Sequence, residues 1–165
     1  MSEVLTHTEG SVLVITINRP DAKNAINAAA TAGIAAAIDE LDGNADLRVG
    51  IITGAGGSIG SELCRQIARQ GAARLLLVDH SEFALYSIHQ ELQALAHQGV
   101  VQTQLTPLLA SVNHPQRMAE LCRLHRPVCI YHAAAYKHVP MVEANAAEGI
   151  QNNVFGTLNM VRVAL

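Results

Sequence analysis

The 165-residue sequence has no tryptophan, two phenylalanines and three tyrosines, so aromatic side chains cannot form the bulk of a core. A core must come from aliphatic residues, which is possible because half of the residues are apolar. Basic residues are also few, and 11 lysines and arginines against 14 acids give a net charge of −3. This balance argues against a nucleic-acid partner, which usually requires a basic surplus. The length favours one domain or two very small ones.

Long apolar runs, paired cysteines and clustered metal ligands are also missing. No run of about 18 apolar residues occurs, so we expect no membrane span. Residues 1–10 lack the pattern of a signal peptide, which predicts a cytoplasmic protein. Cys64, Cys122 and Cys129 are odd in number and lie in apolar patterns, so we expect buried free thiols. The eight histidines form no close pairs with cysteines, and we expect no metal site.

Apolar residues recur along the chain at spacings that alternate between strand and helix. Short aliphatic runs indicate strands, and apolar residues three or four positions apart indicate amphipathic helices. Their alternation is typical of βαβ units. The sequence therefore predicts the α/β class: a mainly parallel, Rossmann-like sheet with helices on both faces, plus an N-terminal β-hairpin and helix. The expected strands are 6–9, 11–18, 48–53, 74–79, 101–109 and 128–131, and the expected helices are 24–42, 58–70, one after Ser81, 116–126 and 144–165.

The order of the expected strands follows from the same fold. A Rossmann sheet with order 3-2-1-4 places strand 48–53 in the middle, between strands 74–79 and 128–131. Both neighbours of the central strand are then occupied. One solution places strand 11–18 beyond strand 128–131, after a helical crossover through 24–42.

A glycine-rich turn at residues 53–60, with the letters TGAGGSIG, is the strongest local signal. It lies between an expected strand and an expected helix, where a helix N-terminus attracts phosphate groups. Gly54 and Gly57 suit a tight turn and a close approach of the backbone to a pyrophosphate, and Gly60 suits close helix packing. Asp79 ends the next strand, where an acid accepts hydrogen bonds from the adenosine ribose and favours NAD over NADP. The alternative is a plain strand–turn–helix corner with Asp79 exposed.

Residues 54–165 resemble the nucleotide-binding half of the nucleoside-diphosphate-sugar 4,6-dehydratases of polysaccharide biosynthesis, which are extended short-chain dehydrogenases. The matching segments are 54–67, 81–92, 131–143 and 152–157. The resemblance implies an adenine dinucleotide partner, NAD, and a set of binding residues. The pyrophosphate would lie along Gly54, Gly57, Ser58, Ile59 and Gly60, and the adenosine ribose would be held by Asp79. The nicotinamide ribose would lie beside Ala133, Ala134 and Ala135. Lys137 would be a remnant of the sugar-nucleotide site.

One departure from this family concerns the adenine. In the family, an acid after the third strand usually meets the adenine amino group. The corresponding segment here is 110–114, with the letters ASVNH, and His114 falls where that acid is expected. We therefore expect the cofactor to bind weakly.

Residues 4–57 resemble a different family, the crotonases (enoyl-CoA hydratases and isomerases). The matching segments are VLVITINRPDAKNAIN at 12–27 and DLRVGIITGAGG at 46–57. In that family the segment at 22–25 helps to bind coenzyme A. The two resemblances meet at TGAGGS, residues 53–58, which both families nearly share. We interpret the chain as a recombined or engineered chimera, a single α/β domain 1–165 built from a crotonase-like segment 1–53 and a Rossmann half-domain 54–165.

The residues for catalysis in either family are missing from this sequence. A short-chain dehydrogenase needs a tyrosine with a lysine four residues later, which lowers the pKa of the tyrosine. The three tyrosines are followed at that distance by Gln90, Ala135 and Pro140. The crotonase oxyanion loop is replaced by residues 58–62, which continue as dehydratase-like helix. We therefore expect no catalytic residue.

Three hypotheses remain open from the sequence. The first is an NAD-binding module without turnover. The second is a folded polypeptide with neither ligand nor activity. The third is an enzyme with residual enoyl-CoA hydratase or sugar-nucleotide dehydratase activity. Since a short sheet leaves apolar edges open, we also expect a homodimer.

Overall fold

The computed structural model describes residues 4–9, 12–17, 28–29, 31–33, 35–36 and 49–165. The chain divides into two compact units, Met1–Leu47 and Arg48–Leu165. In the first unit, strands β1 (Val4–Glu9) and β2 (Val12–Ile17) form an antiparallel hairpin with Val4 opposite Ile17. This confirms the expected hairpin. Within the expected helix 24–42, the described residues between 28 and 36 are helical, and the remainder lies outside the described residues.

Strand β2 forms a two-stranded sheet with β1. A hairpin of this kind needs only a short turn between its strands. The placement of strand 11–18 beyond strand 128–131 stays a prediction. The expectation of one domain with a junction at residue 53 stays a prediction.

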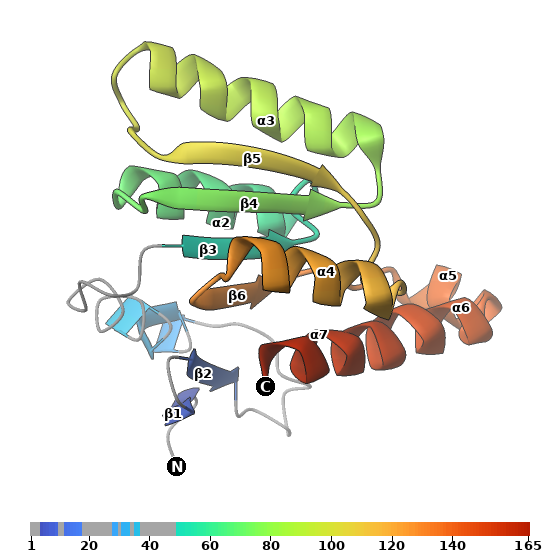
Figure 1. Cartoon of the computed structure of the whole chain (residues 1–165). Coiled ribbons are helices and arrows are strands. Elements are labelled where there is room, and N and C mark those ends of the chain that lie inside the picture. Colours follow the sequence, from blue (N-terminus) through green and yellow to red (C-terminus); the bar gives the residue numbers. More distant parts are fainter. Residues whose placement is uncertain (1–3, 10–11, 18–27, 30, 34, 37–48) are drawn as a thin grey trace. The chain divides into compact units, whose positions relative to one another are not determined.

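The second unit is built on four parallel strands. These are β3 (Val49–Thr53), β4 (Arg74–Asp79), β5 (Gln104–Leu109) and β6 (Cys129–His132). Their order is β5-β4-β3-β6, and all three neighbouring pairs are parallel. Ile51 of the central strand lies opposite Leu76 on one side and Ile130 on the other. The expected order 3-2-1-4 is confirmed (Figure 1).

Helices cover both faces of this sheet, as expected (Figure 1). One layer contains α2 (Ser58–Arg69) and α3 (Glu82–His97), which pack on the sheet through Ile67, Ile88 and Leu92 among others. The other contains α4 (Pro115–His125) and α7 (Thr157–Ala164), which contribute Met118, Leu121 and Met160.

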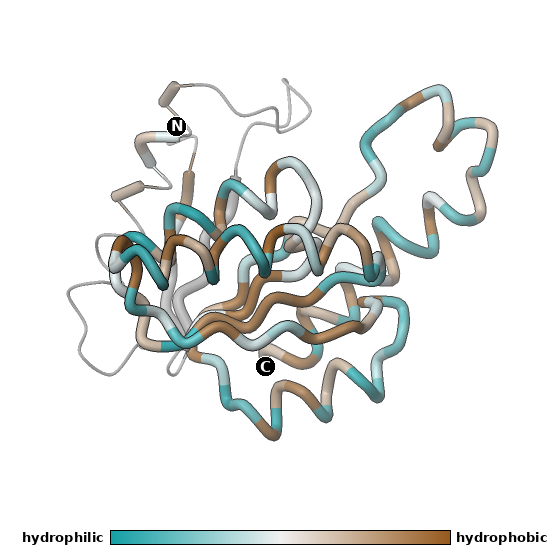
Figure 2. The backbone as a smooth tube through the Cα atoms, turned by 90° about the horizontal axis from the view of Figure 1, so that it is seen from above, coloured by the Kyte–Doolittle hydropathy of each residue, from teal (hydrophilic) through white to brown (hydrophobic). Residues whose placement is uncertain are grey.

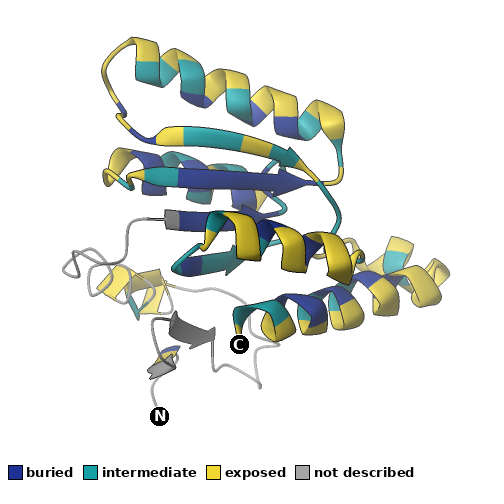
Figure 3. Ribbon diagram, viewed as in Figure 1, coloured by how far each residue is buried: buried dark blue, intermediate teal, exposed yellow. Residues whose placement is uncertain are grey.

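The core of this unit consists of two aliphatic clusters, one on each face of the sheet. Successive side chains of a strand point to opposite faces. Leu75 and Leu77 of β4 therefore join the α2–α3 cluster, and Leu76 and Val78 join the α4–α7 cluster. Figure 3 shows β3 and β4 as the most buried strands, and Figure 2 shows mainly hydrophobic residues along the strands and alternating hydrophilic and hydrophobic residues along the helices. The run RLLLVD is continuous in the sequence because both faces of β4 are covered.

Strand β5 begins later than expected. Residues 101–103 precede it, and Val101 is buried against the α3 side of the core. The C-terminal turn of α3 continues into this segment, because the Val100 amide donates to the Leu95 carbonyl. Pro107 lies inside the strand, which is possible because β5 is at the edge of the sheet.

The expected single helix 144–165 consists of three consecutive helical segments: α6 (Ala146–Ile150), the π-helix η2 (Gln151–Gly156) and α7. The short helix α5 (Val139–Ala144) precedes them. Asn145 interrupts the first turn, since its φ of −131° is not helical and its side-chain amide donates to the Met141 carbonyl. A π-helical turn then precedes Gly156, where a Cβ atom would lie 2.8 Å from a methyl group of Val112. Apolar spacing alone does not reveal such breaks.

No helix in the part of the chain that the structure describes is long and apolar enough to cross a membrane.

Candidate functional site

The glycine-rich turn packs directly on two neighbouring segments. Gly54 has a φ of +71°, and a Cβ atom there would lie 2.8 Å from the backbone of Ala133. A Cβ atom on Gly56 would lie 2.4 Å from that of Ala84, and one on Gly60 only 1.9 Å from the Gly54 carbonyl oxygen. These three positions need glycine for the fold itself.

Gly57 differs from the other glycines of the turn. Its φ of −69° is open to any residue, and a Cβ atom there would meet only the Gly54 carbonyl oxygen, at 3.2 Å. Packing therefore demands glycine at Gly57 much less than at its neighbours. It immediately precedes helix α2, whose N-terminus has no side-chain cap. The free amides there offer a partial positive charge to an anion.

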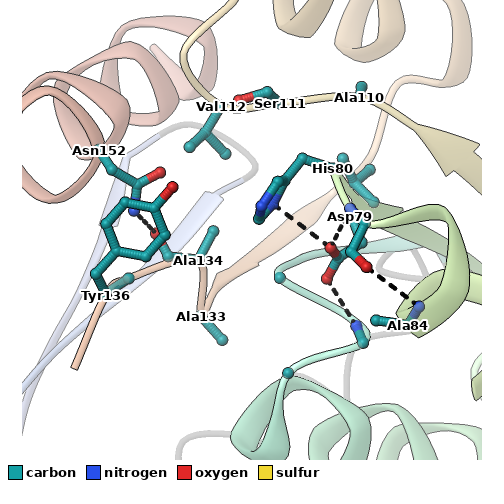
Figure 4. Close-up of a pocket in the computed structure, with 16 residues that line it drawn as sticks. Asp79, His80, Ala84, Ala110, Ser111, Val112, Ala133, Ala134, Tyr136 and Asn152 are labelled. Carbon is teal, nitrogen blue, oxygen red and sulfur yellow. Dashed lines mark hydrogen bonds and ion pairs between the residues drawn. The ribbon is translucent and has the colours of Figure 1, made fainter. Parts of the chain in front are cut away.

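Asp79 ends β4 beside this turn, and its side chain is only 6% exposed. One carboxylate oxygen accepts from the Gly56 amide at 2.9 Å, and the other accepts from the Ser81 amide at 2.8 Å. Each oxygen retains capacity for a further donor. The His80 ring lies beside the carboxylate, with its Nδ1 atom at 3.6 Å (Figure 4). Asp79 thus fixes the turn and still presents an acceptor.

The loop after β6 forms the opposite side of the site and is held by two asparagines of η2. Asn153 accepts from the Tyr136 amide at 2.8 Å and donates to the Tyr136 carbonyl at 2.9 Å. Asn152 donates to the Ala134 carbonyl at 3.2 Å and accepts from the Asn113 side chain at 3.4 Å. Both asparagines therefore set the path of the loop.

His132, the last residue of β6, forms hydrogen bonds with the residue before the glycine-rich turn and with the first residue of α7. Its Nδ1 atom lies 2.7 Å from the Thr53 hydroxyl, and its Nε2 atom lies 3.0 Å from the Thr157 hydroxyl. The Thr157 hydroxyl donates to the Asn153 carbonyl, so it accepts from Nε2–H, and Nδ1 then accepts from Thr53. Burial lowers the pKa of His132, which favours this neutral form.

These elements surround a cavity of about 220 Å³ at the carboxyl ends of the strands. This is where open α/β sheets bind ligands. In Figure 4, Asp79 and His80 lie on one side of the cavity, with Tyr136 and Asn152 on the other. The lining consists of Gly54, Gly56, Gly57, residues 78–81, Ala84, residues 110–112, residues 133–136 and Asn152.

The structure brings together six of the residues that the sequence analysis selected for the cofactor: Gly54, Gly57, Asp79 and Ala133, Ala134 and Ala135 all line the cavity. Ser58 and Ile59 are exposed at the start of α2, and Gly60 is buried beneath the turn. His114 does not line it, and is the N-cap residue of α4. Their roles in binding stay predictions.

Sequence reasoning missed several lining residues. Gly56 was available as a middle glycine of the motif, but Ser111, Tyr136 and Asn152 face the cavity only because distant segments meet there. All three lie in segments that the family resemblance singled out, 110–114, 131–143 and 152–157, but the sequence does not show which residues of these segments face the cavity.

Lys137 lies outside this cavity, in the lining of a neighbouring one of about 420 Å³. That second cavity lies between the loop 135–138 and helices α5 and α6. The Lys137 ammonium group donates to the Ser58 hydroxyl at 2.7 Å. It therefore lies at the start of α2, beside the phosphate-binding position that the turn predicts.

Comparisons with known proteins identify relatives that are described as polysaccharide biosynthesis proteins. The sequence is 42% identical over 114 residues to "Capsular polysaccharide biosynthesis protein CapD" of Staphylococcus aureus, which covers 69% of this chain and 18% of the relative. The chain thus spans about a fifth of that relative's length.

Two solved structures share the fold. UDP-glucose-4-epimerase from Stenotrophomonas maltophila, with bound NAD and formylated UDP-arabinopyranose, matches with a TM-score of 0.58 and 22% identity, over 70% of this chain and 33% of that one. The Bordetella bronchiseptica enzyme WbmG, in complex with NAD and UDP, matches with a TM-score of 0.53 and 23% identity, over 71% and 33%. The mainly parallel, Rossmann-like fold is confirmed.

Two families match the sequence, and their ranges overlap. Residues 7–80 match the enoyl-CoA hydratase/isomerase family, which agrees with the crotonase resemblance of the N-terminal segment. Residues 51–165 match the family described as polysaccharide biosynthesis protein, which is more than half of the chain. The chain therefore belongs to the polysaccharide biosynthesis protein family.

Proposed function

We propose that this chain is an NAD-binding Rossmann fragment of the nucleotide-sugar 4,6-dehydratase type, without complete catalytic machinery. The observation that carries the proposal is the contrast within the glycine turn. The fold explains the glycines at 54, 56 and 60, but little in the fold requires one at Gly57, which faces the cavity beside a free helix N-terminus. A pyrophosphate that approaches the backbone there would explain it.

The other cavity residues fit the same ligand. A pyrophosphate along Gly54, Gly57, Ser58 and Ile59 places the adenosine ribose at Asp79, which still has acceptor capacity. Gly60 would act indirectly, through close packing of α2. Ala133, Ala134 and Ala135 offer a wall without bulky side chains on the nicotinamide side. The buried carboxylate of Asp79 would repel a 2′-phosphate, so we propose NAD rather than NADP.

Two related proteins of known structure contain NAD in their crystals, which supports a dinucleotide here. Bound NAD would supply hydride-transfer chemistry, but the proton-transfer pair of a short-chain dehydrogenase is missing from the sequence. We propose that the chain has no dehydratase or hydratase turnover. The two overlapping family matches support our interpretation of a recombined or engineered chimera.

The direct experiment is a calorimetric titration with NAD. We expect weak binding, and we expect Gly57→Val to raise the dissociation constant at least about tenfold by filling the pyrophosphate position. Ser87→Val is the matched control, because Ser87 is exposed on α3 outside the cavity. Circular dichroism melts establish that both variants fold. Absence of binding at millimolar NAD, together with silent ligand-observed NMR, would favour the folded polypeptide without a ligand.

We also propose that the chain forms a homodimer in solution. Strands β5 and β6 end the four-stranded sheet, and open edges pair readily with other chains. Large exposed side chains on η2 and α7, among them Phe155, Leu158 and Val161, add an apolar surface. Light scattering over a tenfold concentration range tests this. A constant mass near 17.5 kDa would contradict it. The cytoplasmic location stays a prediction.

A further inference from the structure

The far end of the cavity from the glycine turn is formed by residues 110–112, here called the base wall. It follows strand β5, the neighbour of β4, and the Ala110 amide donates to the Asp79 carbonyl at 3.0 Å. If the proposed function is right, the pyrophosphate lies at the turn and the adenosine ribose at Asp79. The purine base must then lie beyond Asp79, against the base wall.

The side chains of the base wall are almost entirely apolar. Ala110 and Val112 have only methyl groups in their side chains, and Val112 is 4% exposed. Ser111 carries the one polar side chain of the wall, and neither a carboxylate nor an ammonium group occurs in it. Figure 4 shows Ser111 and Val112 side by side at this end of the cavity. A base bound there is therefore recognised mainly by packing and by one hydroxyl.

The Ser111 hydroxyl has capacity to spare. Its oxygen accepts from the Asn113 amide at 3.2 Å, which uses one lone pair. A hydroxyl has a second lone pair and one hydrogen, so it can either accept from or donate to a ligand. A carboxylate in the same place could only accept. It would favour the 6-amino group of adenine and repel the 6-oxo group of hypoxanthine.

We infer that Ser111 makes this site tolerant at position 6 of the purine, so that the cavity binds 6-amino and 6-oxo purine dinucleotides with similar affinity. The hydroxyl accepts from the amino group of adenine in one case and donates to the oxo group of hypoxanthine in the other. The inference rests on the proposed function. It names the residue that sets base specificity at the same site.

The test compares NAD with nicotinamide hypoxanthine dinucleotide, which differs from NAD only in the 6-oxo group. Calorimetry gives both dissociation constants for the full chain and for two variants. Ser111→Asp retains an acceptor for the Asn113 amide but adds a carboxylate to the wall. Ser87→Asp adds the same charge on the exposed face of α3, outside the cavity.

For the unmodified chain we expect the two dissociation constants to agree within about threefold, because the one polar side chain of the wall can serve either ligand. Ser111→Asp should favour NAD by about tenfold or more. A carboxylate cannot donate a hydrogen bond to the 6-oxo group and repels it. Ser87→Asp should leave the ratio unchanged. Ser111→Ala, which is small enough to fold readily, should weaken both ligands to a similar degree.

The outcomes separate this inference from the proposed function. A preference of the unmodified chain for NAD of about tenfold or more would overturn the inference and leave the dinucleotide site intact. An unchanged ratio in a folded Ser111→Asp would also overturn it, because another group would then read the base. Failure of both dinucleotides to bind would overturn the proposed function, and the inference with it.

Discussion

The glycine-rich turn at residues 54–57 and the loop at residues 133–136 form two walls of one cavity, but different forces hold them. The turn is shaped by its own backbone: Gly57 donates to the Gly54 carbonyl, and Gly60 packs against that same carbonyl. The loop has few internal bonds, and side chains from η2 fix it from outside. The turn is therefore held by local backbone contacts, whereas the loop that faces it depends on tertiary contacts.

This difference predicts how each wall fails. A change within the turn should strain backbone that has nowhere to move, and should therefore destabilise the whole unit. A change in the supports of the loop should release a segment without disturbing the sheet.

Gly60→Ala should have the largest effect. The added Cβ atom would lie 1.9 Å from the Gly54 carbonyl oxygen, which is backbone and cannot rotate away. We expect a loss of about 3 kcal/mol or more in the free energy of unfolding, as for severe overpacking. Urea denaturation followed by circular dichroism measures it. Gly57→Ala is the control, with a much smaller loss expected; equal losses in both variants would contradict the distinction drawn between these glycines.

Asn153→Ala should have an intermediate effect confined to the loop. It removes the two bonds to the Tyr136 backbone, and each hydrogen bond contributes about 1 kcal/mol or less where solvent has access. We expect faster amide exchange at Tyr136 and its neighbours, with little change at β4. Asn145→Ala, which removes a bond to the Met141 carbonyl instead, is the control. Uniformly faster exchange in both walls would show that the loop is not an independent element.

The same contrast explains what the sequence could and could not predict. The turn, α2 and Asp79 follow from nearby residues, so their positions agree with the expectation. The strand order follows from handedness and alternation, and it is also correct. The path of 133–137 depends on amides about 17 residues further on, in a π-helical turn that apolar spacing does not encode. The sequence analysis considered His114 and not Ser111 for the adenine contact, because the sequence alone does not show that His114 is already the N-cap residue of α4.

Lys137→Met should test the side-chain hydrogen bond between the loop and the start of α2. The ammonium group lies at the start of α2, where it would add to the attraction of the helix N-terminus for a pyrophosphate. Because Lys137 is exposed, we expect only about a threefold weaker affinity for NAD, diminishing further at high salt. Lys137→Arg should retain most of the affinity. If Lys137→Met left NAD affinity unchanged at low salt, the link would be structural only.

The smallest expected effect is a dependence of stability on pH through His132. Burial holds the pKa of His132 below its ordinary value of 6.5 in the folded chain. The unfolded chain therefore binds the proton first as the pH falls. Stability from this group is complete above pH 6.5 and is lost as the pH falls from there toward the folded pKa.

A second histidine behaves in the same direction and must be separated from the first. Burial also lowers the pKa of His89, which lies on α3. His89 takes no part in the hydrogen bond between Thr53 and His132. We expect the denaturation midpoint to fall between pH 7.5 and about 5.5, and His132→Gln to reduce that fall more than His89→Gln does.

His132 is the more buried of the two histidines. It forms a hydrogen bond with Thr53 at the start of the turn, and it immediately precedes the loop. Protonation should therefore also lower the amide protection factors of the loop, because the Nδ1 atom can no longer accept from Thr53. An equal fall in the unmodified chain and in His132→Gln would mean that His132 does not cause the pH dependence of stability.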